Sequence, residues 1–182
     1  MHLADSADSA ARALAAYVRH GVERDATVLL VVRLETWNRA AVELVRDGVP
    51  VGDMVATGRL LVRDSSATLA SLMRGARPDR ARFEDVIAPL VRDCAARGRP
   101  VHAYGDMVDL LAADGQFDAA ERLEDLWNEL AARVPFTLLC GYSSSGFIGT
   151  DEGPDALARL RRQHSDLECD PEDLAASELA RA

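Results

Sequence analysis

The side chains that could bind a metal or act as nucleophiles are few in this sequence, and their spacing favours neither role. Its four histidines are scattered, with no pair three or four residues apart, and its three cysteines form no close pair. A zinc site or a disulfide framework usually shows such pairs. We therefore expect free, mostly buried thiols and no metal, although a site built from His102, Asp106 and a distant cysteine is left open. The positions are His2, His20, His102, His164, Cys94, Cys140 and Cys169.

Two of these residues have competing interpretations. Cys140 lies near the end of a predicted strand, and a cation such as Arg33 or His102 beside it would make it an accessible thiolate, suited to redox or metal sensing. A buried and unreactive thiol is the favoured interpretation, because free cysteine is among the most buried residue types. His102 falls in another predicted strand, where we expect a structural histidine whose hydrogen bonds are satisfied.

The motifs of nucleotide-binding and hydrolytic enzymes are absent. The 21 lysine and arginine positions are all arginines, so the chain has no P-loop lysine, and no GxxxxGK[ST] or GxSxG sequence occurs. The two glycines of segment 141–146 do not have the spacing of a dinucleotide-binding loop, and the serines at 143–145 are more typical of a flexible loop than of a nucleophile. We predict that the protein is not an enzyme and uses no cofactor; nucleotide binding without hydrolysis is a weaker alternative.

Length, charge and hydropathy indicate one acidic globular domain. The 182 residues carry a formal net charge of −9, and 48% of them are hydrophobic. A chain of this size buries roughly 70% of its unfolded surface, so we expect a single domain over residues 1–170 and a helical or frayed tail over 171–182. The acidic surface argues against direct nucleic-acid binding, which depends on clustered cations. With no apolar span and no signal peptide, we expect no membrane contact and a cytoplasmic location.

The elements that must position these side chains can be predicted from hydropathy. Residues 27–32 form an unbroken apolar run, TVLLVV, which is typical of a strand buried on both faces. Further strands are expected at 59–63, 100–104 and 136–141. Helical spacing of apolar residues predicts helices over 8–20, 36–46, 83–97, 118–133 and 155–163. Pro89 should kink or break the third of these helices. The alternation favours a three-layer α/β fold, with a mostly parallel central sheet flanked by helices.

In such a sheet, ligands bind where loops leave the carboxyl ends of the strands. The expected strands end beside polar and sulfur-bearing side chains. If the strands are neighbours, these side chains would surround the mouth of a single pocket. Trp127 and Asn128 lie on the most regular expected helix, the first in its apolar stripe and the second at the margin. Asp106 is as well suited to capping the next helix as to contacting a ligand. The candidate ligand-binding residues are Tyr104, Asp106, Met107, Trp127, Asn128, Cys140 and Tyr142.

Three short motifs occur in order in the second half of the chain. They are Tyr-Gly-Asp-Met at 104–107, Leu-Glu-Asp-Leu-Trp-Asn at 123–128 and a Pro-Phe-x-Leu-Leu-Cys-x-Tyr segment at 135–142. Together they resemble the MEDS domain, the methanogen/methylotroph DcmR sensory domain, and looser matches extend the resemblance to about residue 168, including His164. Two departures stand out. Asp106 replaces a more frequent glutamate, and the family's opening strand is reduced to residues 1–3, so that a sheet edge or pocket wall is missing or supplied by another chain.

The resemblance implies a RecA/KaiC-like fold without a working phosphate-binding loop. It also implies a sensory module that binds small organic compounds, including hydrocarbon derivatives. From the rule for parallel sheets, we expect the compound at the carboxyl ends of the strands. We expect it to signal to a partner protein, such as a histidine kinase or an anti-sigma-type regulator. The alternative is a pure protein-interaction module on a degenerate ATPase fold, which predicts an exposed apolar patch, oligomers such as a homodimer, and no pocket of ligand size.

Overall fold

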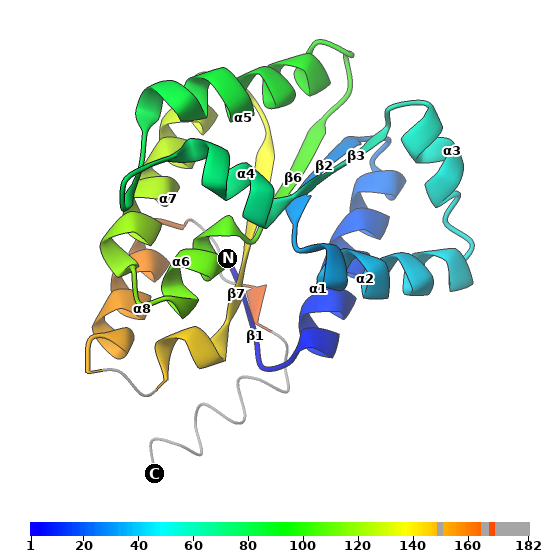
Figure 1. Cartoon of the computed structure of the whole chain (residues 1–182). Helices are drawn as coiled ribbons and strands as arrows, with labels where there is room; N and C mark the ends of the chain where they lie inside the picture. The colour runs from blue at the N-terminus through cyan, green and yellow to red at the C-terminus, as the bar shows by residue number, and fades with distance from the viewer. Residues whose placement is uncertain (149–150, 165–167, 170–182) are drawn as a thin grey trace.

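A six-stranded parallel sheet forms the centre of the protein, in the order β3-β2-β6-β7-β1-β8 (Figure 1). It is seen in a computed structural model, which describes residues 1–148, 151–164 and 168–169. Each neighbouring pair of strands in this sheet is parallel. The strands are β1 (His2–Ala4), β2 (Thr27–Val32), β3 (Leu60–Asp64), β6 (Val101–Gly105), β7 (Thr137–Ser143) and β8 (Glu168–Cys169). The predicted α/β class with a parallel central sheet is confirmed.

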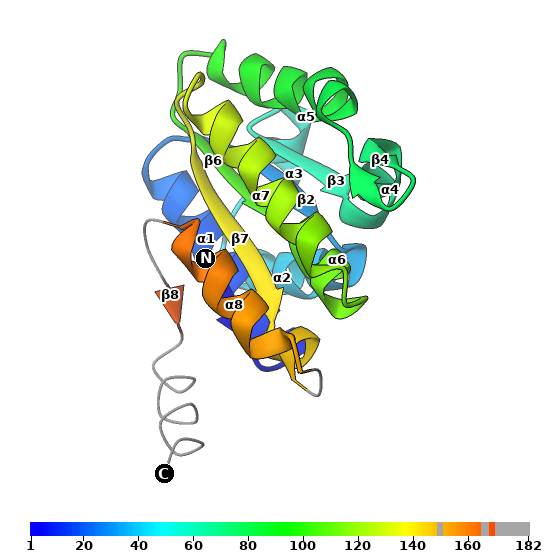
Figure 2. The ribbon, with the colours of Figure 1, turned by 90° about the vertical axis from the view of Figure 1, so that its left-hand side faces the viewer.

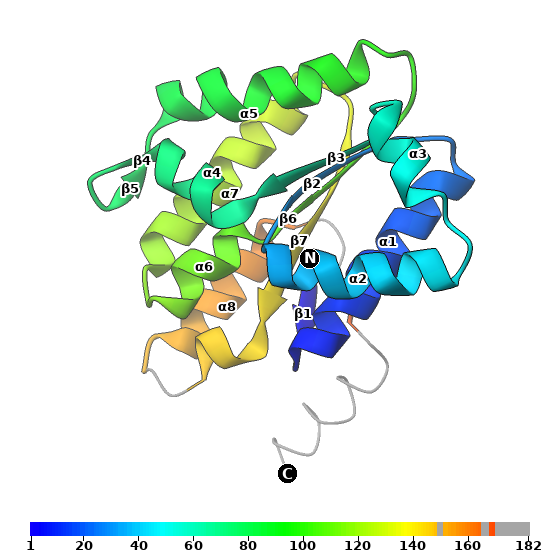
Figure 3. The ribbon, with the colours of Figure 1, turned by 45° about the vertical axis from the view of Figure 1, so that its right-hand side comes forward.

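Helices cover both faces of the sheet (Figures 1 and 3). The first face carries α1 (Ala7–Glu23), α2 (Leu34–Arg46) and α3 (Val51–Ala56). The second face carries α4 (Ser65–Leu72), α5 (Arg80–Ala95), α6 (Met107–Ala113), α7 (Phe117–Ala131) and α8 (Gly153–Arg162). Within the described ranges, no helix is both long and apolar enough to cross a membrane.

The alternation of side chains along a strand explains why β2 is apolar at every position. Val28, Leu30 and Val32 pack against the first helical layer, while Leu29 and Val31 pack against the second. The whole strand is buried, as expected for a central strand covered on both sides. The hydrophobic run in the sequence therefore indicates both the strand and the two layers around it.

Several elements differ from the sequence-based expectations. The helices α3 and α4 were not predicted, nor was the antiparallel pair β4 (Met73–Arg74) and β5 (Arg77–Pro78), because these segments are short and lack clear periodicity. Pro89 does not break α5, whose buried residues on both sides of it hold the helix in the core. The serine segment is not a plain loop either: β7 extends through Ser143, and a 3-10 turn follows over Ser144–Phe147.

The opening strand is present, although it is short. His2, Leu3 and Ala4 pair with residues 141–143 of β7, so the chain itself supplies this part of the sheet. β8 pairs with β1 on the other side. The prediction of a missing edge is therefore wrong for the carboxyl-terminal half of β7. The predicted tail at 171–182 lies outside the described residues.

Candidate functional site

The sheet separates the seven predicted ligand-binding residues instead of gathering them in one mouth. Tyr104 packs with the first helical layer, whereas Met107, Trp127, Cys140 and Tyr142 belong to the core beneath the second layer. All five are almost fully buried, with exposed fractions of 1–2%. Side chains alternate across a strand, so residues near the ends of neighbouring strands do not automatically share a face. Sequence position alone could not reveal this division.

An ion-pair network occupies the carboxyl ends of the central strands. The Arg33 guanidinium, at the end of β2, donates to Asp109 Oδ2 over 2.6 Å. Asp109 Oδ1 also accepts the backbone N–H of Ser143 at the end of β7, over 2.7 Å. The Asp106 carboxylate accepts the backbone N–H of Arg33 over 3.1 Å. These contacts tie the ends of β2, β6 and β7 together, so the charged groups at the predicted mouth pair with one another.

Asp106 is at the N-cap position of α6, but its side chain makes no capping hydrogen bond there. The carboxylate turns to the start of α2 instead, so capping of α6, one of the two roles considered from the sequence, is wrong. Burial raises the pKa of Asp106, while the Arg33 hydrogen bond and charge and the Ser65 hydroxyl oppose the rise. Asp106 Oδ1 has no partner of good hydrogen-bond geometry in the described part of the chain. The residue is thus a buried acid of the network, with one oxygen unpartnered among the described residues.

Tyr104 fits on the first face because its hydroxyl end lies over Gly141, two residues beyond its register partner Leu139 on β7. A Cβ added to Gly141 would lie 2.2 Å from the Tyr104 hydroxyl oxygen. Burial raises the pKa of Tyr104 strongly, and the nearby charges of Asp106 and Asp109 raise it further. The phenol is therefore a neutral, packed group of the core.

An open cavity of about 970 Å³ lies beside the amino-terminal half of β7. β7 pairs there with β6 on one side, and the described residues provide no strand on the other, because β1 reaches only residues 141–143. α1 and α7, on opposite faces of the sheet, form the two walls. The lining of the cavity combines apolar and polar side chains, and includes Tyr17, His20, His102, Trp127, Asn128 and Leu139. Of the seven predicted residues, Trp127 and Asn128 therefore border this cavity.

His102 lies in the wall of the cavity, on β6. Its ring centroid is 5.5 Å from that of Tyr17 and 5.6 Å from that of His20. Burial lowers the pKa of His102, and the nearby charges of His20 and Arg24 lower it further. The position in a strand is confirmed, and Nδ1 has no hydrogen-bond partner among the described residues.

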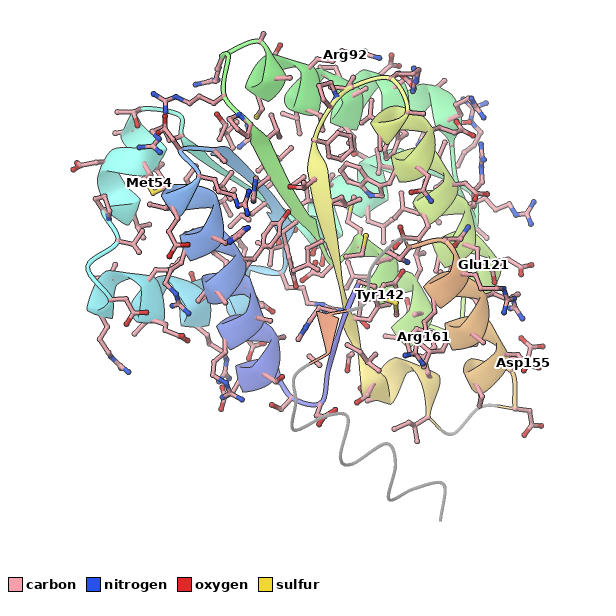
Figure 4. The ribbon with its side chains drawn as sticks, turned by 180° about the vertical axis from the view of Figure 1, so that it is seen from behind. Met54, Arg92, Glu121, Tyr142, Asp155 and Arg161 are labelled. Carbon is pink, nitrogen blue, oxygen red and sulfur yellow. The ribbon has the colours of Figure 1, made fainter. Side chains whose placement is uncertain are left out.

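A second polar cluster lies on the other face, between β7, α7 and the end of α8. Figure 2 shows these three elements side by side, and Figure 4 labels Tyr142 of the cluster. Glu124 Oε1 accepts the Tyr142 hydroxyl over 2.5 Å, and Glu124 Oε2 accepts the Cys140 thiol over 3.4 Å. His164 Nε2 lies 3.3 Å from Glu124 Oε1. One ligand atom each from Glu124, Cys140 and His164 lies within 4.8 Å of the others. This set, and not His102 with Asp106, is where the described residues could hold a metal.

The cluster also decides between the two interpretations of Cys140. The thiol is 1% exposed and faces the Glu124 carboxylate rather than Arg33 or His102. Burial and the Glu124 charge raise the pKa of Cys140 well above its usual range, and they do the same to the pKa of Tyr142. The accessible thiolate is therefore wrong, and Cys140 is a buried neutral thiol. Cys94 is a free and buried thiol as expected.

Two buried acids were missed by reasoning from sequence. Asp109 is 2% exposed and Glu124 is 1% exposed. Glu124 lies three residues before Trp127, on the apolar face of α7, and Asp109 interrupts the apolar helix α6. A charged residue on an otherwise apolar helical face was the available signal, because such residues are seldom buried without a partner.

Comparison with known proteins agrees with the motifs. The family described as MEDS: MEthanogen/methylotroph, DcmR Sensory domain has a model that matches residues 1–165. No match is found among curated proteins.

Proposed function

The chain belongs to the MEDS family of sensory domains, and from this premise we propose that it binds a small organic molecule and signals to a partner protein. In this proposal the domain acts in the cytoplasm, without catalysing a reaction. The ligand occupies the cavity beside β7, between α1 and α7. It does not occupy the carboxyl ends of β2 and β6, where the charged groups pair with one another.

The cavity is the observation that carries the proposal. Its volume of about 970 Å³ is at the upper end of the range common for small-molecule sites, roughly 300–1,000 Å³. Such sites combine apolar walls with a few polar groups that orient the ligand. Here the apolar part includes Phe136 and Leu139, and the polar part includes Tyr17, His20 and Asn128. A compact organic molecule with one or two polar groups fits this lining.

The position of the cavity also supports a signalling role. Its walls belong to both helical layers, since α1 packs on one face of the sheet and α7 on the other. The Asn128 amide donates to the backbone carbonyl of Gln163 over 3.2 Å, so α7 is linked to the end of α8 beside the cavity. A ligand that contacts both walls would favour one relative position of the layers over others, which is how binding shifts a conformational equilibrium.

Native mass spectrometry of the purified chain tests the proposal, after a chelator has removed metal ions. We expect a mass excess of an organic compound in the native spectrum that disappears on denaturation. Ala13 lines the cavity from α1, so Ala13→Trp should abolish the excess, whereas Ala10→Trp on the same helix lies outside the lining and should keep it. A chain without excess mass, or an excess that persists in Ala13→Trp, would contradict ligand binding in this cavity.

Once the compound is identified, thermal stability gives a second test. A ligand that binds only the folded state stabilises it by about 2.7 kcal/mol at one hundred times its Kd. The midpoint of unfolding should therefore rise with ligand concentration for the wild type and the Ala10→Trp variant. It should stay constant for Ala13→Trp.

A protein-interaction module is the second candidate, and the outer face of α2 favours it. Leu34, Val42 and Val45 are 51%, 62% and 62% exposed. Their spacing of eight and three residues places them on one side of the helix. If a regulatory partner covers this side of α2, a double variant with Val42→Ser and Val45→Ser should no longer bind that partner. Unchanged partner binding by that variant would exclude this surface.

A further inference from the structure

Glu124, Cys140 and His164 are three different types of metal-binding side chain that the fold buries together. Glu124 comes from α7, Cys140 from β7, and His164 follows α8. The ligand atoms, an oxygen, a sulfur and a nitrogen, lie within 4.8 Å of one another. In a tetrahedral zinc site, metal–ligand distances of about 2.0–2.3 Å place ligand atoms about 3.3–3.8 Å apart. The separations of Glu124 from Cys140 and from His164, 3.4 Å and 3.3 Å, are in this range.

The imidazole of His164 is oriented by a backbone carbonyl. Nδ1 lies 2.8 Å from the carbonyl oxygen of Leu160. Because a carbonyl oxygen only accepts hydrogen bonds, Nδ1 carries the hydrogen, and in the neutral ring Nε2 presents a lone pair. Metal-binding histidines are typically held in this way, with the second ring nitrogen bonded to a carbonyl or carboxylate.

The lone pair of His164 Nε2 points into the cluster. Nε2 lies 3.3 Å from Glu124 Oε1, and the side chain is only 9% exposed. Nε2 has no hydrogen-bond partner in the described ranges. A lone pair that faces a carboxylate oxygen repels it unless a positive charge lies between them. A proton on Nε2 would supply this positive charge, but it would bridge only His164 and Glu124. A metal ion would supply the charge and bind Cys140 as well.

The charges of the three groups suit a divalent ion. Glu124 is 1% exposed and forms an ion pair with His164. The positive charge of the N-terminal amino group also lies near enough to act on the adjacent Cys140. Burying a carboxylate is costly unless charges of opposite sign compensate it. Glutamate, a thiolate and a neutral imidazole together balance a charge of +2, and metal binding itself drives the loss of the thiol proton.

We propose that Glu124, Cys140 and His164 bind a divalent transition-metal ion of the zinc class. A sulfur and a nitrogen donor favour such an ion over magnesium or calcium, which prefer oxygen ligands. The Tyr142 hydroxyl, which donates to Glu124 Oε1, orients the carboxylate. Glu124 and His164 also line the cavity beside β7, which gives the ion a route to the cluster. The site does not depend on the proposed organic ligand.

Cobalt(II) titration of the full chain, after treatment with a chelator, tests this site. We expect one Co²⁺ to bind per chain, with the intense near-ultraviolet absorption of a thiolate–cobalt bond, and Zn²⁺ to displace it. Cys140→Ala should remove this absorption. Cys94→Ala is the matched control, because Cys94 is an equally buried free cysteine on α5, outside the cluster, and should leave the absorption unchanged.

The proposal would be overturned if the wild-type chain lacked the thiolate–cobalt absorption, or if the absorption survived in Cys140→Ala. Loss of the absorption in Cys169→Ala would also overturn it, because Cys169, the third cysteine of the chain, is not one of the proposed ligands. Far-ultraviolet circular dichroism shows whether each variant is folded. If Cys140→Ala does not fold, His164→Gln replaces it. That variant should lose at least about tenfold in Co²⁺ affinity, since even outer partners of a ligand contribute that much, and an unchanged affinity would refute the site.

Discussion

Replacing Gly141 with alanine should destabilise the protein, because the new methyl group would collide with Tyr104. A Cβ at Gly141 would lie 2.2 Å from the Tyr104 hydroxyl oxygen and 2.8 Å from Cζ of the same ring. Ordinary contacts begin near 3.4 Å, so the ring or the strand must move by about 1 Å. Tyr104 is 2% exposed, so the ring lies in the packed core of the first face. Overpacking of a dense core costs about 1–3 kcal/mol, which exceeds the gain of roughly 0.5–1 kcal/mol from replacing a strand glycine.

A double-mutant cycle with Tyr104→Phe isolates this collision. Phenylalanine removes the atom at 2.2 Å and leaves the ring carbon at 2.8 Å, so the clash is reduced but not abolished. Urea unfolding of the four proteins would give the free energy of unfolding of each. We expect Gly141→Ala to cost at least about 1 kcal/mol less in the Tyr104→Phe background than in the wild type, as direct contact predicts.

Gly52 provides a matched control for the same substitution. A Cβ at Gly52 meets no atom within 4 Å, and the residue lies in α3. Gly52→Ala should therefore leave stability unchanged or raise it by up to about 1 kcal/mol, through helix propensity. Equal effects of Gly141→Ala in the two Tyr104 backgrounds, or a fully stable Gly141→Ala protein, would refute the reasoning.

Two further predictions concern buried charge. Asp109→Asn removes the carboxylate that accepts from Arg33 over 2.6 Å and leaves the guanidinium with the more distant Asp106, 3.8 Å away. It should lower the free energy of unfolding by about 2 kcal/mol, since a hydrogen bond to a charged group contributes about 1.5–3 kcal/mol. The matched control, Asp8→Asn, breaks an exposed pair with Arg39 and should cost less than about 1 kcal/mol; equal losses in urea unfolding would contradict the role of the network. Because the pKa of folded His102 lies below its ordinary value near 6.5, the unfolded chain binds a proton more readily, and stability should fall as the pH drops below about 6.5. His102→Phe should show a smaller fall between pH 7 and pH 5, and an identical fall would exclude His102 as the cause.

The sequence determined the class of fold, because its strongest signals are local. The apolar run at 27–32 indicates a strand that packs against apolar layers on both of its faces. The apolar stripe of α7 likewise indicates a helix that packs on one side against the core. The family also followed from sequence, since its motifs are short segments of contiguous residues. Even the burial of Glu124 was available in principle, from an acid within an apolar helical face.

Only the tertiary structure decided where the candidate sites lie. The alternation of side chains placed Tyr104 and Cys140 on opposite faces, although both lie near the ends of neighbouring strands. The short pairing of β1 with β7 left space for a cavity beside residues 137–139. Glu124 and His164 are forty residues apart in the chain and 3.3 Å apart in space. Contacts of this kind depend on which strands are neighbours and how far their register extends, and no local pattern of residues encodes either.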